Sequence, residues 1–165
     1  MKQILALVIC LFLAYSMNAK ERIVNQPPFV AWSSTILEIE SITLNDTATI
    51  LNISANDQSG WWFQIVSDTY LLADGVKYPL KSSEGFELDK PITMPESGTM
   101  SFRLIFPALP QTIKEIDFFE GNDERSFRIW GIRLDGQPIK NSLAGKTNPK
   151  KEFVLETPVI KAGNA

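Results

Sequence analysis

The residue types that are missing decide most of the chemistry that this chain could perform. It contains no histidine, and its single cysteine, Cys10, lies in an apolar N-terminal run. Serine–histidine and cysteine–histidine nucleophile systems both need a histidine, so they are excluded. Structural zinc sites use cysteine and histidine ligands, and thiol redox chemistry needs cysteine, so neither is predicted for the rest of the chain. The glycines stand singly at turns and form no phosphate-binding loop.

Carboxylates are the catalytic groups that remain. Six of them fall into two groups: Glu84, Glu87 and Asp89, and Glu115, Asp117 and Glu120. A pair of carboxylates can hydrolyse glycosides, but these alternate with apolar residues, as side chains on a solvated sheet face do. Residues 122–124 (Asn-Asp-Glu) offer oxygen ligands for calcium without the ordered spacing of a calcium loop. We therefore predict no catalytic residue, no metal site and no cofactor.

A pair of tryptophans, Trp61-Trp62, is the best candidate for recognition of another molecule. Adjacent residues of a strand point to opposite faces, so one indole should face the core and the other should face away from it. Trp61 shares the phase of Phe63 and Ile65, which predicts that Trp61 is the core residue and Trp62 the exposed one. An exposed indole suits a sugar ring or a partner's side chain. The alternative is that a loop such as residues 20–32 covers Trp62.

Three other aromatic residues are candidates for a contact surface. Tyr70 and Tyr78 flank a predicted hairpin and are expected to extend the patch of Trp62. Phe119 is opposite in phase to Phe118, which predicts that it points outward. The candidate ligand-binding residues are therefore Trp62, Tyr70 and Tyr78, and their ligand is a protein or a glycan.

The elements that must position these residues are strands, and the strongest pattern runs through residues 98–134. Residues 100–106 alternate apolar and polar, and strands are also predicted at 113–120 and 126–134. In the strand at 126–134, the apolar residues stand first at odd positions (Phe127, Ile129) and then at even positions (Ile132, Leu134). One extra residue at Trp130-Gly131, a β-bulge, would bring them to one face. The alternative is a strand that is buried on both faces.

The rest of the chain adds shorter strands and no helix. Further strands are predicted at residues 35–44, 47–55, 61–66, 70–73 and 76–80, with a short edge strand at 86–88. The imperfect alternation of residues 35–44 is attributed to strand twist. Pro27-Pro28 should keep the lead-in from regular pairing. An edge strand or an ordered tail is expected at residues 153–160. About seven to nine antiparallel strands with regular turns predict an all-β sandwich.

The N-terminus has the pattern of a secretory signal peptide. A lysine precedes an apolar run that is too short to span a bilayer, and small residues follow. Cleavage is expected after Ala19, with Ser16 as the alternative site and an uncleaved anchor as the alternative interpretation. Cys10 is interpreted as an apolar filler of the leader, so the mature chain has no disulfide. The expected organisation is a signal peptide (1–19), a lead-in (20–34), the sandwich (35–136) and a polar linker and tail (137–165).

Charge and hydropathy narrow the classes of partner. The formal net charge is -3, and lysine and arginine do not cluster, so binding to nucleic acid is not predicted. No second apolar run of about twenty residues follows the leader, so no mature transmembrane segment is predicted.

Four short motifs carry a resemblance to a known family: Asp74-Gly75-Val76-Lys77-Tyr78, Met94-Pro95-Glu96-Ser97-Gly98, Phe102-Arg103-Leu104-Ile105-Phe106-Pro107 and Ile116-Asp117-Phe118. Over residues 35–135 the chain resembles small immunoglobulin-like domains of exported Bacteroides-group proteins, some of which precede thioredoxin-like domains. The resemblance implies an immunoglobulin-like β-sandwich but no catalytic residue. This chain has no Cys-x-x-Cys, so a redox role is not implied for it. Asp46-Thr47-Ala48 is similar to the O-glycosylation site of that group, which implies modification of Thr47.

These observations predict a non-catalytic exported β-sandwich. It would act as a periplasmic accessory or protein-interaction module, with an extracellular location as the alternative. The alternative function is a glycan-binding module that uses the aromatic residues near Trp62.

Overall fold

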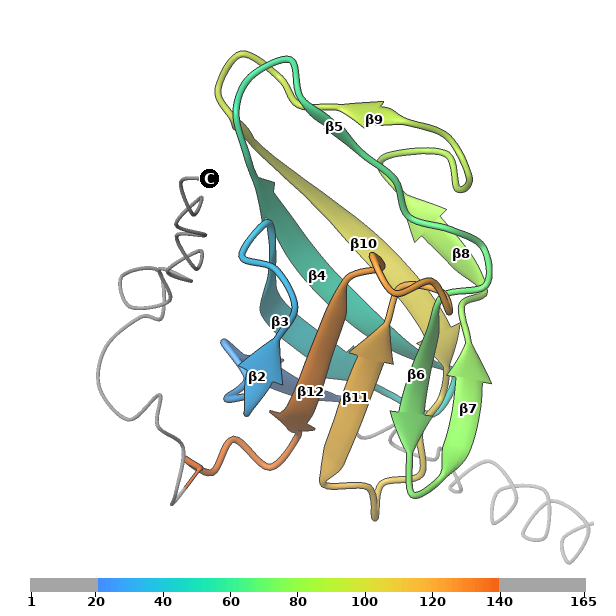
Figure 1. The fold of residues 1–165 in the computed structure, drawn as a ribbon. Helices are drawn as coiled ribbons and strands as arrows, with labels where there is room; N and C mark the ends of the chain where they lie inside the picture. The colour runs from blue at the N-terminus through green and yellow to red at the C-terminus, as the bar shows by residue number, and fades with distance from the viewer. Residues whose placement is uncertain (1–20, 140–165) are drawn as a thin grey trace, which may run out of the picture.

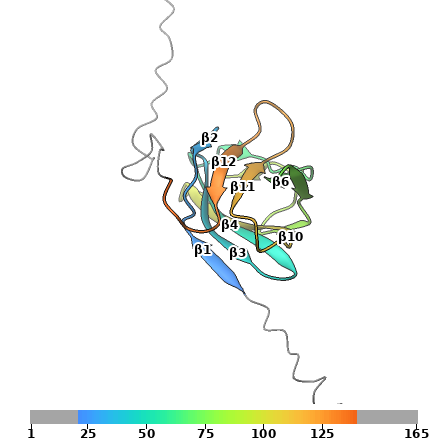
Figure 2. The same cartoon turned by 90° about the horizontal axis from the view of Figure 1, so that it is seen from below.

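The computed structural model describes residues 21–139, and this part of the chain is all-β. Two five-stranded antiparallel sheets and one two-stranded ribbon make up the fold (Figure 1). The view from below shows the two large sheets as separate layers that face each other (Figure 2). Residues 21–139 contain no helix, and therefore none that is long and apolar enough to cross a membrane. The prediction of an all-β chain of antiparallel strands is confirmed.

Three pairs of consecutive strands, β3-β4, β6-β7 and β11-β12, are neighbours within one sheet, and the other connections lead from one sheet to another. The first sheet has the order β1-β3-β4-β10-β8, with the bounds Arg22–Asn25, Leu37–Leu44, Ala48–Asn56, Thr99–Pro107 and Ser82–Glu84. The second has the order β2-β12-β11-β6-β7, with the bounds Ala31–Trp32, Arg128–Arg133, Glu115–Phe119, Tyr70–Ala73 and Val76–Pro79. The ribbon pairs β5 (Trp62–Phe63) with β9 (Ile92–Thr93).

The described residues form twelve strands, and the prediction of seven to nine is too low. The additional strands, β1, β2, β8 and β9, are two to four residues long. Such strands contain too few residues for alternation to be visible in the sequence.

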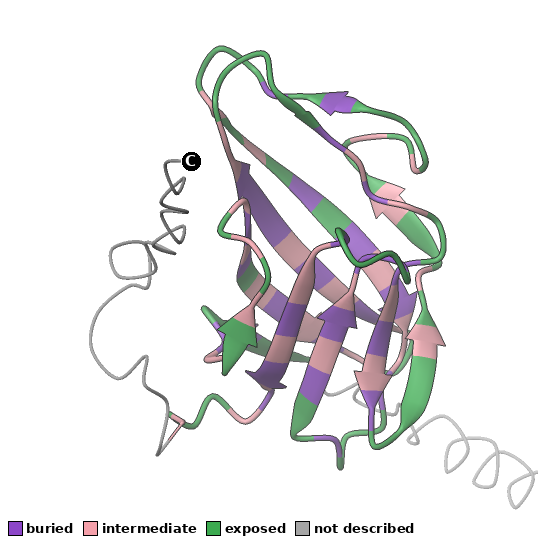
Figure 3. Cartoon of the chain, in the orientation of Figure 1, coloured by how far each residue is buried: buried purple, intermediate pink, exposed green. Residues whose placement is uncertain are grey.

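One apolar core lies between the two large sheets. On β10, Phe102, Leu104 and Phe106 are 4%, 0% and 0% exposed. They belong to one cluster with Phe118 and Leu71 of the opposite sheet. Figure 3 shows the resulting alternation of buried and less buried residues along the long strands. Each fully buried side chain of this size contributes roughly 1.5–3 kcal/mol, so this face of β10 is a main source of stability.

The bulge predicted in β12 is confirmed. Ile116 pairs with Ile132 and Phe118 pairs with Ile129, so Trp130 and Gly131 together oppose Asp117. Gly131 has φ +64°, a conformation that glycine adopts at little cost. Its N–H donates to Asp117 Oδ1 at 2.7 Å. The bulge brings Ile129 and Ile132 to the core face.

A second bulge lies in β3 and explains the imperfect alternation of residues 35–44, so the interpretation as strand twist is wrong. Ile39 pairs with Ile53 and Ser41 with Asn52, so Glu40 is an extra residue without a partner in the ladder. The extra residue brings Leu37, Ile39, Ile42 and Leu44 to the buried face. The Glu40 carboxylate accepts a hydrogen bond from Ser54 Oγ at 2.7 Å. The cause of the phase change is therefore a bulge.

The sequence predicts that Pro27-Pro28 keep the lead-in from regular pairing, and this prediction is wrong. The lead-in supplies β1, which pairs with β3 in the first sheet, and β2, which pairs with β12 in the second. The two prolines stand between β1 and β2, so they interrupt pairing only where the chain crosses between sheets. The Pro28 carbonyl also accepts a hydrogen bond from Arg133 N–H at 2.7 Å.

The short edge strand lies earlier in the chain than predicted. Residues 86–88 are not a strand; the strand is Ser82–Glu84, which pairs with β10. Phe86 instead folds back onto the core, where its ring meets Phe102 edge-on at 5.0 Å. Burial of the Phe86 ring takes precedence over continuation of the ladder.

Candidate functional site

The most distinctive surface feature is an aromatic tip, which we define as Trp61, Trp62 and the adjoining loops 57–60 and 95–98. Trp61 is 57% exposed and Trp62 is 63% exposed. Trp62 is thus exposed, as its strand phase predicts, and the lead-in belongs to the two sheets. The prediction that Trp61 is a core residue is wrong. In Figure 3 the ribbon and its loops are mostly exposed, and they lie at the upper end of the sandwich.

Trp61 is exposed because the ladder ends beside it. Only Trp62 and Phe63 pair with β9, so the alternation that places Phe63 in the core does not extend back to Trp61. Met94, which is 2% exposed, fills the core at this position. The Met94 N–H donates to the Trp61 carbonyl at 2.7 Å, and the Gly60 N–H donates to the Met94 carbonyl at 3.1 Å. The backbone of Trp61 is therefore fixed while its indole projects past the core.

The ribbon is anchored to the sandwich from below. Phe63 and Ile92 are 5% and 8% exposed. The Phe63 ring lies 6.1 Å from Phe102 and 6.3 Å from Phe127, within the range of favourable aromatic contacts. These contacts hold the opposite side of the ribbon, which leaves Trp62 on its outer side.

The two loops of the tip contact each other. Asp57 N–H donates to the Gly98 carbonyl at 3.1 Å, and Gly98 N–H donates to the Pro95 carbonyl at 2.9 Å. A Cβ at Gly98 would lie 2.8 Å from the Asp57 carbonyl oxygen, which is closer than real Cβ atoms come to such an atom. The loops can approach this closely because residue 98 is a glycine.

Tyr70 and Tyr78 do not form one patch with each other. Tyr78 pairs with the buried Leu71, so it shares the core face and packs partly buried against the core. Tyr70 lies on the outer face, where its ring stacks on Phe119 at 5.1 Å and Lys77 Nζ lies 3.9 Å from the ring centre. Phe119 points outward, as predicted. The prediction that Tyr70 and Tyr78 extend one patch is wrong, because the pairing of β6 with β7 places them on opposite faces of the sheet.

Most of the candidate catalytic carboxylates have partners that occupy them. Glu84 pairs with Arg103 at 3.1 Å and Glu115 with Arg133 at 3.4 Å. Three others contact separate parts of the fold. Asp117 accepts a hydrogen bond from the Gly131 N–H, and Asp89 accepts one from the Ser67 N–H at 2.8 Å. Glu87 forms an ion pair with Lys90. These carboxylates are distributed over β8, the β8–β9 connection and β11, and each one has a structural contact.

The polar side chains of the hairpin tip at residues 122–124 form hydrogen bonds with neighbouring groups of the protein. Asn122 Nδ2 donates to Asp68 Oδ2 at 3.1 Å, and the Arg125 N–H donates to Asp123 Oδ1 at 2.8 Å. The latter hydrogen bond is the main cause that lowers the pKa of Asp123. Between residues 21 and 139, no three histidine, cysteine, aspartate or glutamate side chains gather in a way that could hold a metal ion.

Glu120 differs from the other carboxylates because it is buried, at 5% exposure. The prediction that it lies on a solvated face is wrong: it shares the phase of Ile116 and Phe118, which both face the core. Glu120 Oε1 accepts the Val66 N–H at 2.9 Å. Burial raises the pKa of Glu120, and hydrogen bonds from Val66, Phe127 and Ser126 partly oppose that rise.

We expect Glu120→Gln to change how stability depends on pH. A raised native pKa means that the contribution of Glu120 is fully present below the ordinary value of 4.5 and is lost as pH rises through the native pKa. Gln keeps an acceptor for Val66 N–H and carries no charge. The variant should therefore gain stability relative to wild type as pH rises from 4.5 through the native pKa of Glu120. Urea unfolding of both proteins across this range measures the difference, and a difference that does not change with pH would contradict the prediction.

Thr47 is exposed in the turn between β3 and β4. Its hydroxyl donates to Asn45 Oδ1 at 2.8 Å, and the same oxygen accepts the backbone N–H groups of Thr47 and Ala48. This turn lies at the end of the first sheet opposite to the aromatic tip, because Leu44 pairs with Thr49 whereas Leu37 pairs with Ala55. The glycosylation of Thr47 stays a prediction.

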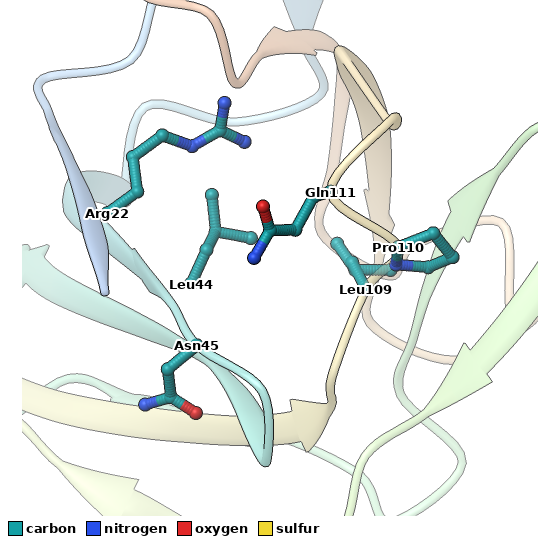
Figure 4. A pocket seen from close by; sticks show the side chains of 6 residues that line it. All are labelled: Arg22, Leu44, Asn45, Leu109, Pro110 and Gln111. Atoms are coloured by element: carbon teal, nitrogen blue, oxygen red, sulfur yellow. The ribbon is translucent and has the colours of Figure 1, made fainter. Parts of the chain in front are cut away.

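A shallow cavity of about 230 Å³ lies at the same end as Thr47, and it is lined by Arg22, Leu44, Asn45, Leu109, Pro110 and Gln111 (Figure 4). The Arg22 guanidinium and the Gln111 carboxamide extend into the same space from opposite sides. The cavity is smaller than the usual range of roughly 300–1,000 Å³ for small-molecule sites. Its residues come from three separate segments of the chain, so no local sequence pattern indicates it.

Indole surfaces and the hydrogen-bonding side chains around them make the aromatic tip the stronger candidate site. Its chemistry is that of contact: apolar faces for stacking, with amide, hydroxyl and carboxylate groups beside them. No family model, curated protein or solved structure matches the chain.

Proposed function

We propose that this chain is a non-catalytic, exported β-sandwich of the immunoglobulin-like kind that binds another molecule through its aromatic tip. The observation that carries the proposal is the exposure of two adjacent tryptophans, 57% and 63%, on a backbone that is held by hydrogen bonds. Exposed tryptophans on a fixed backbone are typical of binding hot spots, because little conformational entropy is lost when they are covered.

Residue types and contacts support binding in preference to catalysis. The chain has no histidine, and its only cysteine lies in the leader pattern. Asp117 and Glu84 could serve as acid or base, but both have structural contacts. Asp117 accepts the Gly131 N–H at the bulge, and Glu84 forms an ion pair with Arg103. The leader pattern and the resemblance to exported Bacteroides-group domains support a periplasmic location.

The position of the tip also suits contact with a partner. β1 begins, and β12 ends, at the end of the sandwich opposite to the ribbon (Figure 1). Both ends of the described chain therefore lie away from Trp61 and Trp62. A partner can reach the tip without displacing either end.

We expect Trp62→Ala to abolish retention of the protein on its target. Purified protein would be incubated with cell-envelope material from the source organism, washed and quantified. Wild type should be retained, and both Trp62→Ala and Trp61→Ala should lose most of that retention, because truncation of a hot-spot tryptophan costs about 2 kcal/mol or more. Val76→Ala is the control, because Val76 is 52% exposed on β7, in a different sheet. Equal retention of all four proteins would contradict the proposed function.

A further inference from the structure

The surroundings of the two indoles restrict what the aromatic tip can bind. Residues 56–62 and 93–99 contain the carboxylates of Asp57 and Glu96 but no lysine or arginine. An anionic polysaccharide, an anionic membrane surface or a nucleic acid would meet negative charge without compensation. The charge of the tip therefore disfavours an anionic ligand.

Several hydrogen-bonding side chains around the indoles are available to a ligand. Thr93 stands directly opposite Trp62 in the ribbon and is exposed. Gln58 and Glu96 are exposed in the two adjoining loops. Within residues 21–139, no side-chain hydrogen bond or ion pair occupies these three groups. A ligand that is rich in hydroxyl groups could both donate to and accept from them.

The apolar area of the tip is small for a protein partner. The other large apolar residues that are strongly exposed, Ile23, Val30 and Val76, belong to β1, the β1–β2 connection and β7. A stable protein–protein interface covers about 800 Å² on each partner and has an apolar centre. Two indoles within a polar ring are instead comparable in size to a few sugar rings, whose C–H faces stack on aromatic rings while their hydroxyls bond to the rim.

We propose that the aromatic tip binds a single chain of a neutral glycan. The proposal rests on the proposed function and names the class of ligand for the same site. The exposed apolar surface of the tip consists of two indoles between loops 57–60 and 95–98. An area of this size suits a single chain that passes over the tip and not a flat surface of packed chains.

Calorimetric titration with defined soluble polysaccharides tests this assignment. The probes are β-glucan, xylan and galactomannan as neutral chains and polygalacturonate as the anionic comparison. Wild type should bind at least one neutral chain and should not bind polygalacturonate. Trp62→Ala should weaken the binding about tenfold or more, whereas Val76→Ala should leave it unchanged. Far-UV circular dichroism and thermal unfolding check that the variants are folded, which is expected because both side chains are exposed.

Three outcomes would overturn the glycan assignment: binding to none of the neutral chains, neutral binding that Trp62→Ala does not weaken, or a preference for polygalacturonate. The envelope-retention experiment separates these failures from failure of the proposed function. If retention depends on Trp62 while no neutral chain binds, the tip is a contact site for another class of molecule. If retention does not depend on Trp62, the proposed function itself is wrong.

Discussion

Phe106→Ala should lower the free energy of unfolding by about 3–5 kcal/mol, which is the usual range for truncation of a buried aromatic residue. Phe106 is 0% exposed and lies on the core face of β10, opposite the second sheet. Small domains are typically stable by about 5–15 kcal/mol, so this single change should remove a large fraction of the total. Urea unfolding followed by tryptophan fluorescence measures the loss.

Phe119→Ala is the matched control for Phe106→Ala. It is the same chemical change on an outward-facing residue that stacks on Tyr70, and the expected loss is about 0.5–1.5 kcal/mol. If Phe106→Ala does not fold, Phe106→Leu provides a milder change in the same direction. Equal losses at the two positions would show that the core is not where the structure places it.

Gly131→Ala should be the most damaging glycine substitution in the second sheet. Gly131 has φ +64°, and an added Cβ would lie 2.4 Å from Val30 Cγ2. The left-handed backbone alone costs a non-glycine residue roughly 1–2 kcal/mol, and the overlap with Val30 adds a cost of roughly 1–3 kcal/mol. We expect a total loss of about 2–5 kcal/mol in urea unfolding.

Gly75→Ala separates the cost of the left-handed backbone from the cost of the overlap with Val30. Gly75 has φ +77°, and an added Cβ there meets nothing within 4 Å, so this variant has the backbone cost without the overlap. Val30→Ala in the Gly131→Ala background removes the Cγ2 overlap and leaves Val30 Cβ 3.0 Å from the added Cβ, so it should recover part of the loss. Losses of equal size for Gly131→Ala and Gly75→Ala would contradict this explanation of the bulge.

The sequence predicts the long strands well because their alternation is long enough to measure. It also locates the bulge at Trp130-Gly131, where the apolar phase changes beside a glycine. The same change of phase occurs in β3 between Ile39 and Ile42, where no glycine indicates the position of the bulge at Glu40. A change of phase is therefore the useful signal for a bulge in this chain, with or without a glycine.

The errors at Trp61 and Glu120 have a common physical origin. Alternation assigns a side chain to a face only where the ladder continues, and the ladder of β5 ends at Trp62, so Trp61 is free to project. Glu120 follows the last residue of β11 in the inward phase, and its charge led the sequence analysis to place it in solvent. Its burial depends on Val66 and Ser126, which are brought near by pairing that the sequence does not show.

The candidate site could be predicted only in part for the same reason. The exposure of Trp62 follows from the alternation of side chains along its own strand. The approach of loops 57–60 and 95–98 depends instead on contacts between Asp57 and Gly98, which are far apart in the sequence. The separation of Tyr70 from Tyr78 depends on which face of the second sheet each occupies.

Indole N–H resonances test the central claim, contact through the aromatic tip, most directly. The chain has four tryptophans, so a ¹⁵N-labelled sample gives four indole signals that single Trp→Phe variants can assign. On addition of solubilised envelope material, we expect the signals of Trp61 and Trp62 to shift or broaden and those of Trp32 and Trp130 to stay in place. Changes confined to Trp32 or Trp130, or no change in any of the four signals, would contradict the account.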